Sequence, residues 1–408
     1  MKILVSNIGS TSYKFRLFEM GADGGRELAR GGADRIDGRP DGPATGGGVL
    51  NWHKQGGASQ SGARDFGDHG AAIEHVLEQL TAGGVLASPK DLDAVAFKAV
   101  MGGDGPPVCR VDDQLLARME YFFPVMPAHN PPYVAAMKWF RQALPGVPLV
   151  AAFETGFHGT IPPRRRFYAV PPEWASRYGV RRYGFHGASH RYIAERTAEL
   201  MMGAANARRI ISCHLGGSSS VCAIRDGRSV ATTMGLSSQS GLPQGNRAGD
   251  FDIFALPLLK KEAAMDTDAV LEALGSGSGL AALSGTGGDM RDIREAAEKG
   301  GEQARLAMDL FVTAVRDYVG AYLVELGGAD AIVFTGGIGE HHPWLREGVC
   351  AGLDFAGVKL DAAKNRAADG ETRIDAADSR TAIWVMPTNE ELVVARQAAE
   401  LLQDKVRG

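Results

Sequence analysis

Short apolar runs, separated by polar and glycine-rich turns, recur along the whole chain and predict β-strands. These runs lie at 3–5, 94–100, 148–153, 210–212, 331–334 and 382–386. Helical spacing of apolar positions separates several of them, most clearly over 302–326. Alternating strand and helix patterns are typical of an α/β fold. Residues 20–70 are rich in glycine and aspartate without a clear period, and predict turns around short strands.

The strand pattern contains an internal repeat. Residues 3–12 align with residues 210–219, and each copy predicts a strand, a hydroxyl-rich glycine turn and a second strand. Backbone N–H groups and hydroxyls of such a turn can converge on an anion, because glycine allows a close approach. Glycine-serine turns also join many hairpins for conformational reasons alone. Their repetition favours a duplicated fold with two phosphate-binding turns.

A third glycine element, Phe334–Glu340, follows the apolar run at 331–334 directly. The spacing GxGxxG is absent, which argues against a dinucleotide-binding Rossmann turn. We expect a loop that covers a nucleotide.

Bulk properties set the class of protein. With 408 residues, the chain predicts two domains. Lys and Arg total 44 and Asp and Glu total 48, a net charge of −4, which argues against a nucleic-acid or anionic-lipid partner. No stretch approaches the roughly 20 apolar residues that span a bilayer, and the opening KILVSN is unlike a signal peptide. The four cysteines have no CxxC spacing, so we expect reduced thiols in a soluble, cytoplasmic protein.

Six ordered strings cover nearly the whole chain and resemble the acetate kinase family. They are SNIGS at 6–10, PAHNPP at 127–132, FETGFH at 153–158, RRYGFHGASH at 181–190, NRAGD at 246–250 and TNEEL at 388–392. The family belongs to the acetate and sugar kinase, heat-shock ATPase and actin superfamily. The resemblance implies two actin-like (ribonuclease H-like) α/β domains, with duplicated phosphate-binding hairpins and an interdomain cleft. We expect residues 1–155 with a C-terminal helix 390–408 in the first domain, and residues 156–389, with the nucleotide site, in the second.

The reaction implied is reversible transfer of the γ-phosphate of ATP to acetate or a related short-chain acid. Because it brings one anion against another, catalysis depends on alignment and on charge neutralisation. The resemblance assigns catalytic roles to Glu154, His186 and Arg247. The Arg247 guanidinium suits a carboxylate or phosphoryl group. For His190 a hydrogen-bonded structural role is favoured.

The same resemblance implies a metal, a nucleotide and an acid site. Asn7 and Glu390 match the residues that hold Mg²⁺, with Mn²⁺ as an alternative, and oxygen ligands suit either ion. Thr388 and Glu391 also form a capping-box pattern that predicts a helix start. The expected ATP or ADP contacts are Lys14, His214, Leu215, Gly216, Gly217, Ser218, Asp289, Met290, Arg291, Gly336, Gly337, Ile338, Gly339 and Glu340. The expected acid contacts are Lys98, Val100, Ala128, Phe185 and Ser238.

Several positions depart from the family pattern. Lys98 replaces an arginine, Glu154 an aspartate and Gly217 an asparagine, while Ala128 and Ser238 replace larger or more apolar groups. Lysine keeps the charge but loses the bidentate fork. We therefore expect a roomier, more hydrophilic acid site.

Three alternatives remain open from the residues. The chain could use another acid or a sugar as acceptor, or pyrophosphate as donor. It could also be a nucleotide-binding protein without catalysis. The resemblance further implies a homodimer.

Overall fold

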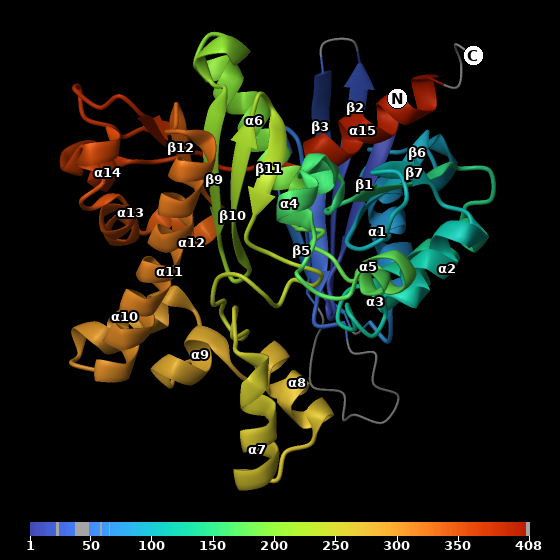
Figure 1. Ribbon diagram of the computed structural model, residues 1–408. Helices are drawn as coiled ribbons and strands as arrows, with labels where there is room; N and C mark the ends of the chain where they lie inside the picture. The colour runs from blue at the N-terminus through green and yellow to red at the C-terminus, as the bar shows by residue number, and fades with distance from the viewer. Residues whose placement is uncertain (22–23, 37–48, 58, 65, 405–408) are drawn as a thin grey trace. The chain divides into compact units, whose positions relative to one another are not determined.

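The computed structural model describes residues 1–21, 24–36, 49–57, 59–64 and 66–404. The chain divides into two compact units: Met1–Gly156 with Asn389–Gly408, and Phe157–Thr388. Each unit has one mixed β-sheet with helices packed against it (Figure 1). Among the described residues, no helix is both long and apolar enough to cross a membrane.

Unit 1 is built on an eight-stranded sheet of order β5-β4-β3-β2-β1-β6-β8-β7. Its strands are β1 (Lys2–Ile8), β2 (Ser12–Gly21), β3 (Gly24–Asp34), β4 (Val49–Lys54), β5 (Ser59–Ala63), β6 (Ala94–Ala99), β7 (Val108–Arg110) and β8 (Leu149–Phe153). Its helices are α1 (His69–Ala82), α2 (Asp113–Tyr121), α3 (Asn130–Ala143) and α15 (Glu390–Asp404). The last of these returns from the far end of the chain and packs against six strands, β1, β2, β3, β6, β7 and β8.

The prediction of short strands within residues 20–70 holds for β4 and β5, of six and five residues, but was wrong for β3. β3 has 11 residues and pairs along its length with β2, and β4 and β5 extend the same sheet. Frequent glycines hid the period-2 pattern. Gly31 and Gly32 lie inside β3, where a Cβ at Gly31 would lie 2.3 Å from the carbonyl oxygen of Asn51. Close approach of neighbouring backbone explains glycine in a strand interior. Residues 37–48 lie outside the described residues.

Unit 2 has a six-stranded sheet of order β11-β10-β9-β12-β14-β13. Its strands are β9 (Arg209–Leu215), β10 (Ser219–Arg225), β11 (Arg228–Thr232), β12 (Ala331–Thr335), β13 (Thr372–Arg373) and β14 (Ala382–Val385). Its helices are α4 (Pro163–Arg166), α5 (Pro172–Tyr178), α6 (Gly187–Leu200), α7 (Leu256–Glu262), α8 (Thr267–Ser276), α9 (Gly279–Ser284), α10 (Met290–Glu298), α11 (Glu302–Leu326), α12 (Gly336–His341), α13 (Pro343–Cys350) and α14 (Ala362–Ala367). The helix predicted at 302–326 is α11, with the same bounds.

The two sheets share one topology, which confirms the duplication. In unit 1 the order β3-β2-β1-β6-β8 has β2 antiparallel to β1, and β6 and β8 parallel. In unit 2 the order β11-β10-β9-β12-β14 has the same directions. The sequence offset between the copies is preserved, because β1 and β9 are both seven residues long and both lead through a three-residue turn into a second strand.

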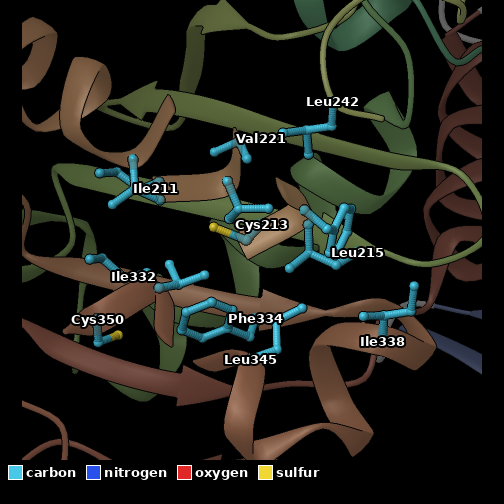
Figure 2. Packing of buried hydrophobic residues seen from close by; sticks show 14 of the residues in the cluster. Ile211, Cys213, Leu215, Val221, Leu242, Ile332, Phe334, Ile338, Leu345 and Cys350 are labelled. Carbon is cyan, nitrogen blue, oxygen red and sulfur yellow. The ribbon is translucent and has the colours of Figure 1, made fainter. Parts of the chain in front are cut away.

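The core of unit 2 lies on both faces of its sheet. On one face, Cys213 and Leu215 of β9 lie beside Phe334 of β12 in a cluster that includes residues of α11 (Figure 2). On the other face, Ile210 and Val333 pack with residues of α6. Burial on both faces explains why the parallel strands read as continuous apolar runs.

Candidate active site

In unit 1, predicted site residues lie where the parallel strands β6 and β8 end. Lys98 lies near the end of β6, and Glu154 follows β8 directly. Because parallel strands end at the same edge of a sheet, Lys98 and Glu154 are neighbours, with Nζ and Oε1 3.9 Å apart. Glu390, the first residue of α15, contacts the same Lys98 ammonium group. Three sequence-predicted residues are thus brought together.

Charge is concentrated in this cluster. The side chain of Lys98 is 17% exposed, so burial alone would lower its pKa, but the carboxylates of Glu390 and Glu154 outweigh that effect and hold it well above its usual range. Lys98 is therefore a permanent cation. A carboxylate at the first position of α15 is also favoured by the positive end of the helix dipole.

Tyr133 is a functional-site residue that the sequence reasoning missed. Its hydroxyl accepts a hydrogen bond from the backbone N–H of Ile8 at 3.1 Å and donates one to Asn7 Oδ1 at 3.2 Å. Tyr133 is buried on α3 and burial raises its pKa, so the hydroxyl stays protonated. Tyr133 therefore helps to orient Asn7. Its place just after the PAHNPP string was the available signal.

The start of α15 differs from the predicted capping box. Asn389, rather than Thr388, caps the helix, since Asn389 Oδ1 accepts a hydrogen bond from the N–H of Leu392 at 3.2 Å. Arg16 Nη1 donates to the same Oδ1 at 3.2 Å. Within the described part of the chain, Thr388 Oγ1 has no hydrogen-bond partner. The Thr388 prediction was wrong because asparagine, one position later, is an equally good N-cap.

The remaining predicted residues of unit 1 have more ordinary surroundings. Lys14 is exposed on β2, opposite Asn7 in the strand register. It lines a cavity of about 410 Å³ together with Arg16 and Arg30. Unit 1 contains two further residues predicted to contact the acid: Val100 is buried and Ala128 is exposed.

In unit 2, His186 has a strained backbone. It precedes α6 with φ 57° and ψ 29°, in the left-handed region that non-glycine residues rarely adopt. Such strain clusters at functional sites, where the surrounding structure maintains it. Here the carbonyl of Phe185 accepts a hydrogen bond of 2.8 Å from Nε2 of the buried His158. Burial lowers the pKa of His158 to about 4, so this histidine is neutral.

The imidazole of His186 is positioned by two neighbours. Its ring stacks on that of His214, with centroids 4.2 Å apart and an interplanar angle of 27°. Its Nδ1 lies 2.8 Å from Ser220 Oγ. The structure therefore brings together two predicted residues, His186 and His214, and adds Ser220, which the sequence reasoning missed. Ser220 lies one residue beyond the aligned repeat.

Arg247 is surrounded by neutral groups. Its Nη1 donates to Ser218 Oγ, to Ser238 O and Oγ, and to Gln244 Oε1, at 3.0–3.4 Å. Burial lowers its pKa from the usual value, yet an arginine remains charged at neutral pH. Because these partners leave the positive charge uncompensated, the guanidinium suits an anion. Ser218 and Ser238 thus lie beside Arg247, and Gln244 is a further residue that sequence reasoning missed.

The glycine turn of the second hairpin packs against the Arg247 segment. Ser218 Oγ donates to Gln244 Oε1 at 2.8 Å, and Gly217 O accepts from the N–H of Gly245 at 3.1 Å. Leu215 is buried, whereas Gly217 is exposed. The turn thus keeps Gly217 at the surface while Ser218 anchors it.

The third glycine element forms α12, directly after β12. Gly336 has φ 78°, and a Cβ there would lie 2.6 Å from the carbonyl oxygen of Leu215, so only glycine fits. The fully buried Arg346 donates to the carbonyls of Gly339 and Glu340, at 2.8 Å each. Arg346 therefore fixes the end of α12. Nothing in the sequence singled it out, because its hydrogen bonds to Gly339, Glu340 and Asn365 form only when α12, α13 and α14 pack together.

Asp289, Met290 and Arg291 begin α10. Asp289 caps the helix by accepting from the N–H of Arg291 at 2.8 Å, and it also pairs with the Arg291 guanidinium at 2.6 Å. These bonds lower the pKa of Asp289 to about 2. Met290 is buried and Arg291 exposed. Their expected contact with adenosine stays a prediction.

Two sheets of one topology, each with a glycine-serine hairpin, define the class as a two-domain, actin-like α/β protein. The family model described as "Acetokinase family" matches residues 2–396, and the chain belongs to that family. An acetate kinase of Heliobacterium modesticaldum is 41% identical over 406 residues, covering 99% of this chain and 100% of that protein. One of Natranaerobius thermophilus is 39% identical, covering 98% and 100%.

Solved structures agree with this assignment. The acetate kinase of Porphyromonas gingivalis superposes with a TM-score of 0.87 at 34% identity, over 98% of this chain and 99% of that one. A propionate kinase of Francisella tularensis gives a TM-score of 0.88 at 30% identity, over 97% and 98%. These four relatives are acetate or propionate kinases, and they support neither a sugar acceptor, nor a pyrophosphate donor, nor a non-catalytic role.

Proposed function

We propose that this chain transfers the γ-phosphate of ATP to the carboxylate of acetate or a related short-chain acid, giving ADP and an acyl phosphate, reversibly. The chain is a phosphotransferase with a carboxyl group as acceptor, and full-length membership of the acetokinase family is the observation that carries this conclusion. A carboxylate oxygen bonds to the γ-phosphorus while the bond from that phosphorus to the β,γ-bridging oxygen breaks.

The charges of unit 2 suit the transferred phosphoryl group. Arg247 retains its positive charge among neutral partners, and His186 is held at a strained backbone position. During the transfer, negative charge spreads over the phosphoryl oxygens, where preorganised donors are most effective. We propose that both residues stabilise this negative charge. The residues proposed to bind the nucleotide are the turn His214–Ser218, Asp289–Arg291 and Gly336–Glu340.

The oxygen ligands of unit 1 suit a divalent metal. Asn7 and Glu390 offer an amide and a carboxylate oxygen, and Mg²⁺ commonly takes one or two protein carboxylates and several waters. Accordingly, no cage of three or more His, Cys, Asp or Glu is needed, and none occurs among the described residues. When bound, the ion would neutralise phosphate charge. The ammonium of Lys98 contacts Glu390, so it competes with the metal for that carboxylate.

We propose that the positions that depart from the family pattern determine which acid is accepted as substrate. Lys98 and Glu154 face each other, and Ser238 touches the Arg247 guanidinium. Lys98 places an ammonium group beside Glu154 in unit 1, and Ser238 places a hydroxyl beside Arg247 in unit 2, so the surroundings within each unit are polar. We therefore propose that propionate and hydroxy acids are accepted alongside acetate; a strong preference for acetate would contradict this.

Hydroxylamine trapping of acyl phosphate tests the activity. Purified protein with Mg²⁺ and ATP should give hydroxamate with acetate and propionate, and none when pyrophosphate replaces ATP. Glu390→Gln should reduce metal-dependent turnover, whereas Glu400→Gln, on the exposed side of the same helix, should not. Folded protein that binds Mg²⁺ and ATP yet gives no hydroxamate with any acid would exclude the proposal.

The remaining assignments follow from the same resemblance. We propose that the first actin-like domain comprises residues 1–155 and 390–408, and that residues 156–389 form the second, with the nucleotide site. We also infer a homodimer in the cytoplasm, for which light scattering after gel filtration is the direct test of the oligomeric state.

A further inference from the structure

Four side chains of unit 2 form a continuous hydrogen-bonded relay. Ser212 Oγ lies 2.8 Å from His190 Nδ1, and His190 Nε2 lies 2.9 Å from Ser220 Oγ. The same Ser220 oxygen lies 2.8 Å from Nδ1 of His186. Ser212, Ser220 and His190 are fully buried, on two adjacent strands and the helix packed against them. The relay thus runs from the interior of unit 2 to His186, the residue predicted to contact the transferred phosphoryl group.

The hydrogens of this relay can point in one of two directions. Ser220 has a single hydroxyl hydrogen but two imidazole neighbours, so it donates to one and accepts from the other. His190 is neutral because burial holds its pKa well below the usual value, so it also has one N–H. Once the donor and the acceptor of one hydrogen bond are known, the donor and the acceptor of every other bond in the relay are determined.

Ser212 decides the direction. Among the described residues, His190 Nδ1 is the hydrogen-bond partner of its hydroxyl, and both groups are buried. If His190 donated from Nδ1, the Ser212 hydrogen would be buried without an acceptor, which is unfavourable. If Ser212 donates instead, His190 Nε2 donates to Ser220, and Ser220 donates to His186 Nδ1. Every hydrogen in the relay then has an acceptor.

We propose that Ser220 and His190 are positioning residues that fix His186 as the neutral tautomer with its hydrogen on Nε2. Since Nδ1 accepts from Ser220, Nε2 carries the ring's only hydrogen, and it is this N–H that His186 offers to the phosphoryl oxygens. This inference rests on the proposed function for the identity of the ligand, but not for the tautomer. The stacked ring of His214 and the bond between His158 and the Phe185 carbonyl hold the imidazole in place.

Nitrogen-15 NMR of histidine-labelled protein without ligands tests the tautomer. His186 is assigned from the signal lost in His186→Gln. At neutral pH it should show a protonated Nε2 and an unprotonated, hydrogen-bonded Nδ1. Ser220→Ala should give a mixture of tautomers. A protonated Nδ1 in the wild-type protein, or an unchanged tautomer in Ser220→Ala, would overturn the proposal.

Three further variants separate positioning from packing. Ser212→Ala removes the hydroxyl that sets the direction of the relay, so it should give a mixture of His186 tautomers although Ser220 and His190 are both still present. His190→Gln retains an amide donor toward Ser220 and should keep more of the Nε2–H tautomer than His190→Leu. Should the two His190 variants show the same tautomer mixture, the relay does not set it.

Kinetics then connect the tautomer to the reaction. Ser220→Ala should lower kcat about 10- to 100-fold with little change in the KM for acetate, whereas Ser220→Thr, which keeps the hydroxyl, should restore part of it. Ser212→Ala should lower kcat by less than Ser220→Ala, because Ser220 still contacts His186 Nδ1 and part of the population keeps the Nε2–H tautomer. If the NMR prediction holds but Ser220→Ala keeps full kcat, His186 does not act on the phosphoryl group, and the assigned use of its N–H fails. Absence of hydroxamate from the wild-type protein would instead refute the proposed function alone.

Discussion

At the scale of single residues, Arg247 shows how a charge is kept available. A guanidinium that faces a carboxylate inside the protein is already neutralised, whereas Nη1 of Arg247 is held by four neutral oxygen contacts. Those contacts orient the group without cancelling its charge. The surroundings of Arg247 make its charge available. The string NRAGD does not determine them, because it is compatible with either a neutral or a charged hydrogen-bond partner.

Replacement of Arg247 should mainly affect turnover. Arg247→Met should lower kcat by at least about 100-fold, and Arg247→Lys by less, because lysine restores the charge but not the planar fork. Arg208→Met is the matched control, since Arg208 is an exposed partner of Asp226 in the same unit. Steady-state kinetics with acetate provide the measurement. A kcat for Arg247→Met within tenfold of wild type would remove this residue from the reaction.

Lys98 and Glu154 should behave as a coupled pair. Lys98 Nζ and Glu154 Oε1 are 3.9 Å apart. A longer cationic side chain at position 98, or a shorter carboxylate side chain at position 154, would therefore change this distance when introduced alone. Lys98→Arg and Glu154→Asp should each lower kcat/KM, and the double variant should recover part of the loss. The coupling free energy should be about 1 kcal/mol or more.

The exposed pair Lys138 and Glu120 supplies the control for that cycle. The corresponding variants, Lys138→Arg and Glu120→Asp, should leave kcat/KM unchanged and uncoupled, because surface pairs contribute little. Additive effects at Lys98 and Glu154 would mean that the two departures from the family pattern arose independently.

At the scale of elements, the start of α15 matters because it places Glu390. The helix begins at Glu390 since Asn389 caps it, and the Asn389 amide also accepts from Arg16 of β2. A single residue therefore joins a strand to the helix that carries the proposed metal ligand. The start of this helix is as predicted from the sequence, but the predicted cap was wrong, because both Thr388 and Asn389 are good N-cap residues and only the backbone conformation distinguishes them.

Substitution at the two candidate caps should separate these interpretations. Asn389→Ala should lower the free energy of unfolding of unit 1 by about 1 kcal/mol, the usual value of an N-cap. Thr388→Ala should change it by less than about 0.5 kcal/mol, as its hydroxyl makes no hydrogen bond to the described residues. Urea unfolding followed by hydrogen exchange of α15 amides gives both values. A larger loss in Thr388→Ala would restore the capping-box interpretation.

At the scale of the whole molecule, buried neutral histidines link stability to pH. Burial lowers the pKa of His158 to about 4 and that of His190 well below its usual value. An unfolded chain takes up protons on these rings below about pH 6.5, whereas the folded chain does not. Folding is therefore increasingly disfavoured as the pH falls from about 6.5 toward 4.

The pH dependence should weaken when His158 is replaced. His158 alone should account for roughly 3 kcal/mol between these limits. His158→Gln should lower stability at pH 7 but reduce the slope of the urea midpoint between pH 6.5 and 4.5. His341→Gln, at an exposed position, should leave the slope unchanged. An equal slope in wild type and His158→Gln would show that His158 does not stay neutral in the folded state.

The sequence by itself determined the α/β class, the two related hairpins, α11 and most of the residues assigned to the site. These features depend on local periodicity, on glycine at turns and on strings of adjacent residues, all of which are present in the unfolded chain. The single long strand β3, Gly24–Asp34, was not predicted because glycines removed the side chains that would have shown the period.

Only the tertiary structure decided how those residues are supported. The positions of Tyr133 beside Asn7 and of Ser220 beside His186 each join segments far apart in sequence. No local pattern specifies such contacts, because they arise when strands pair and helices pack. The electrostatic surroundings of the two cations are also set by the tertiary structure: Lys98 contacts two carboxylates, whereas the four acceptors of Arg247 Nη1 are neutral oxygens.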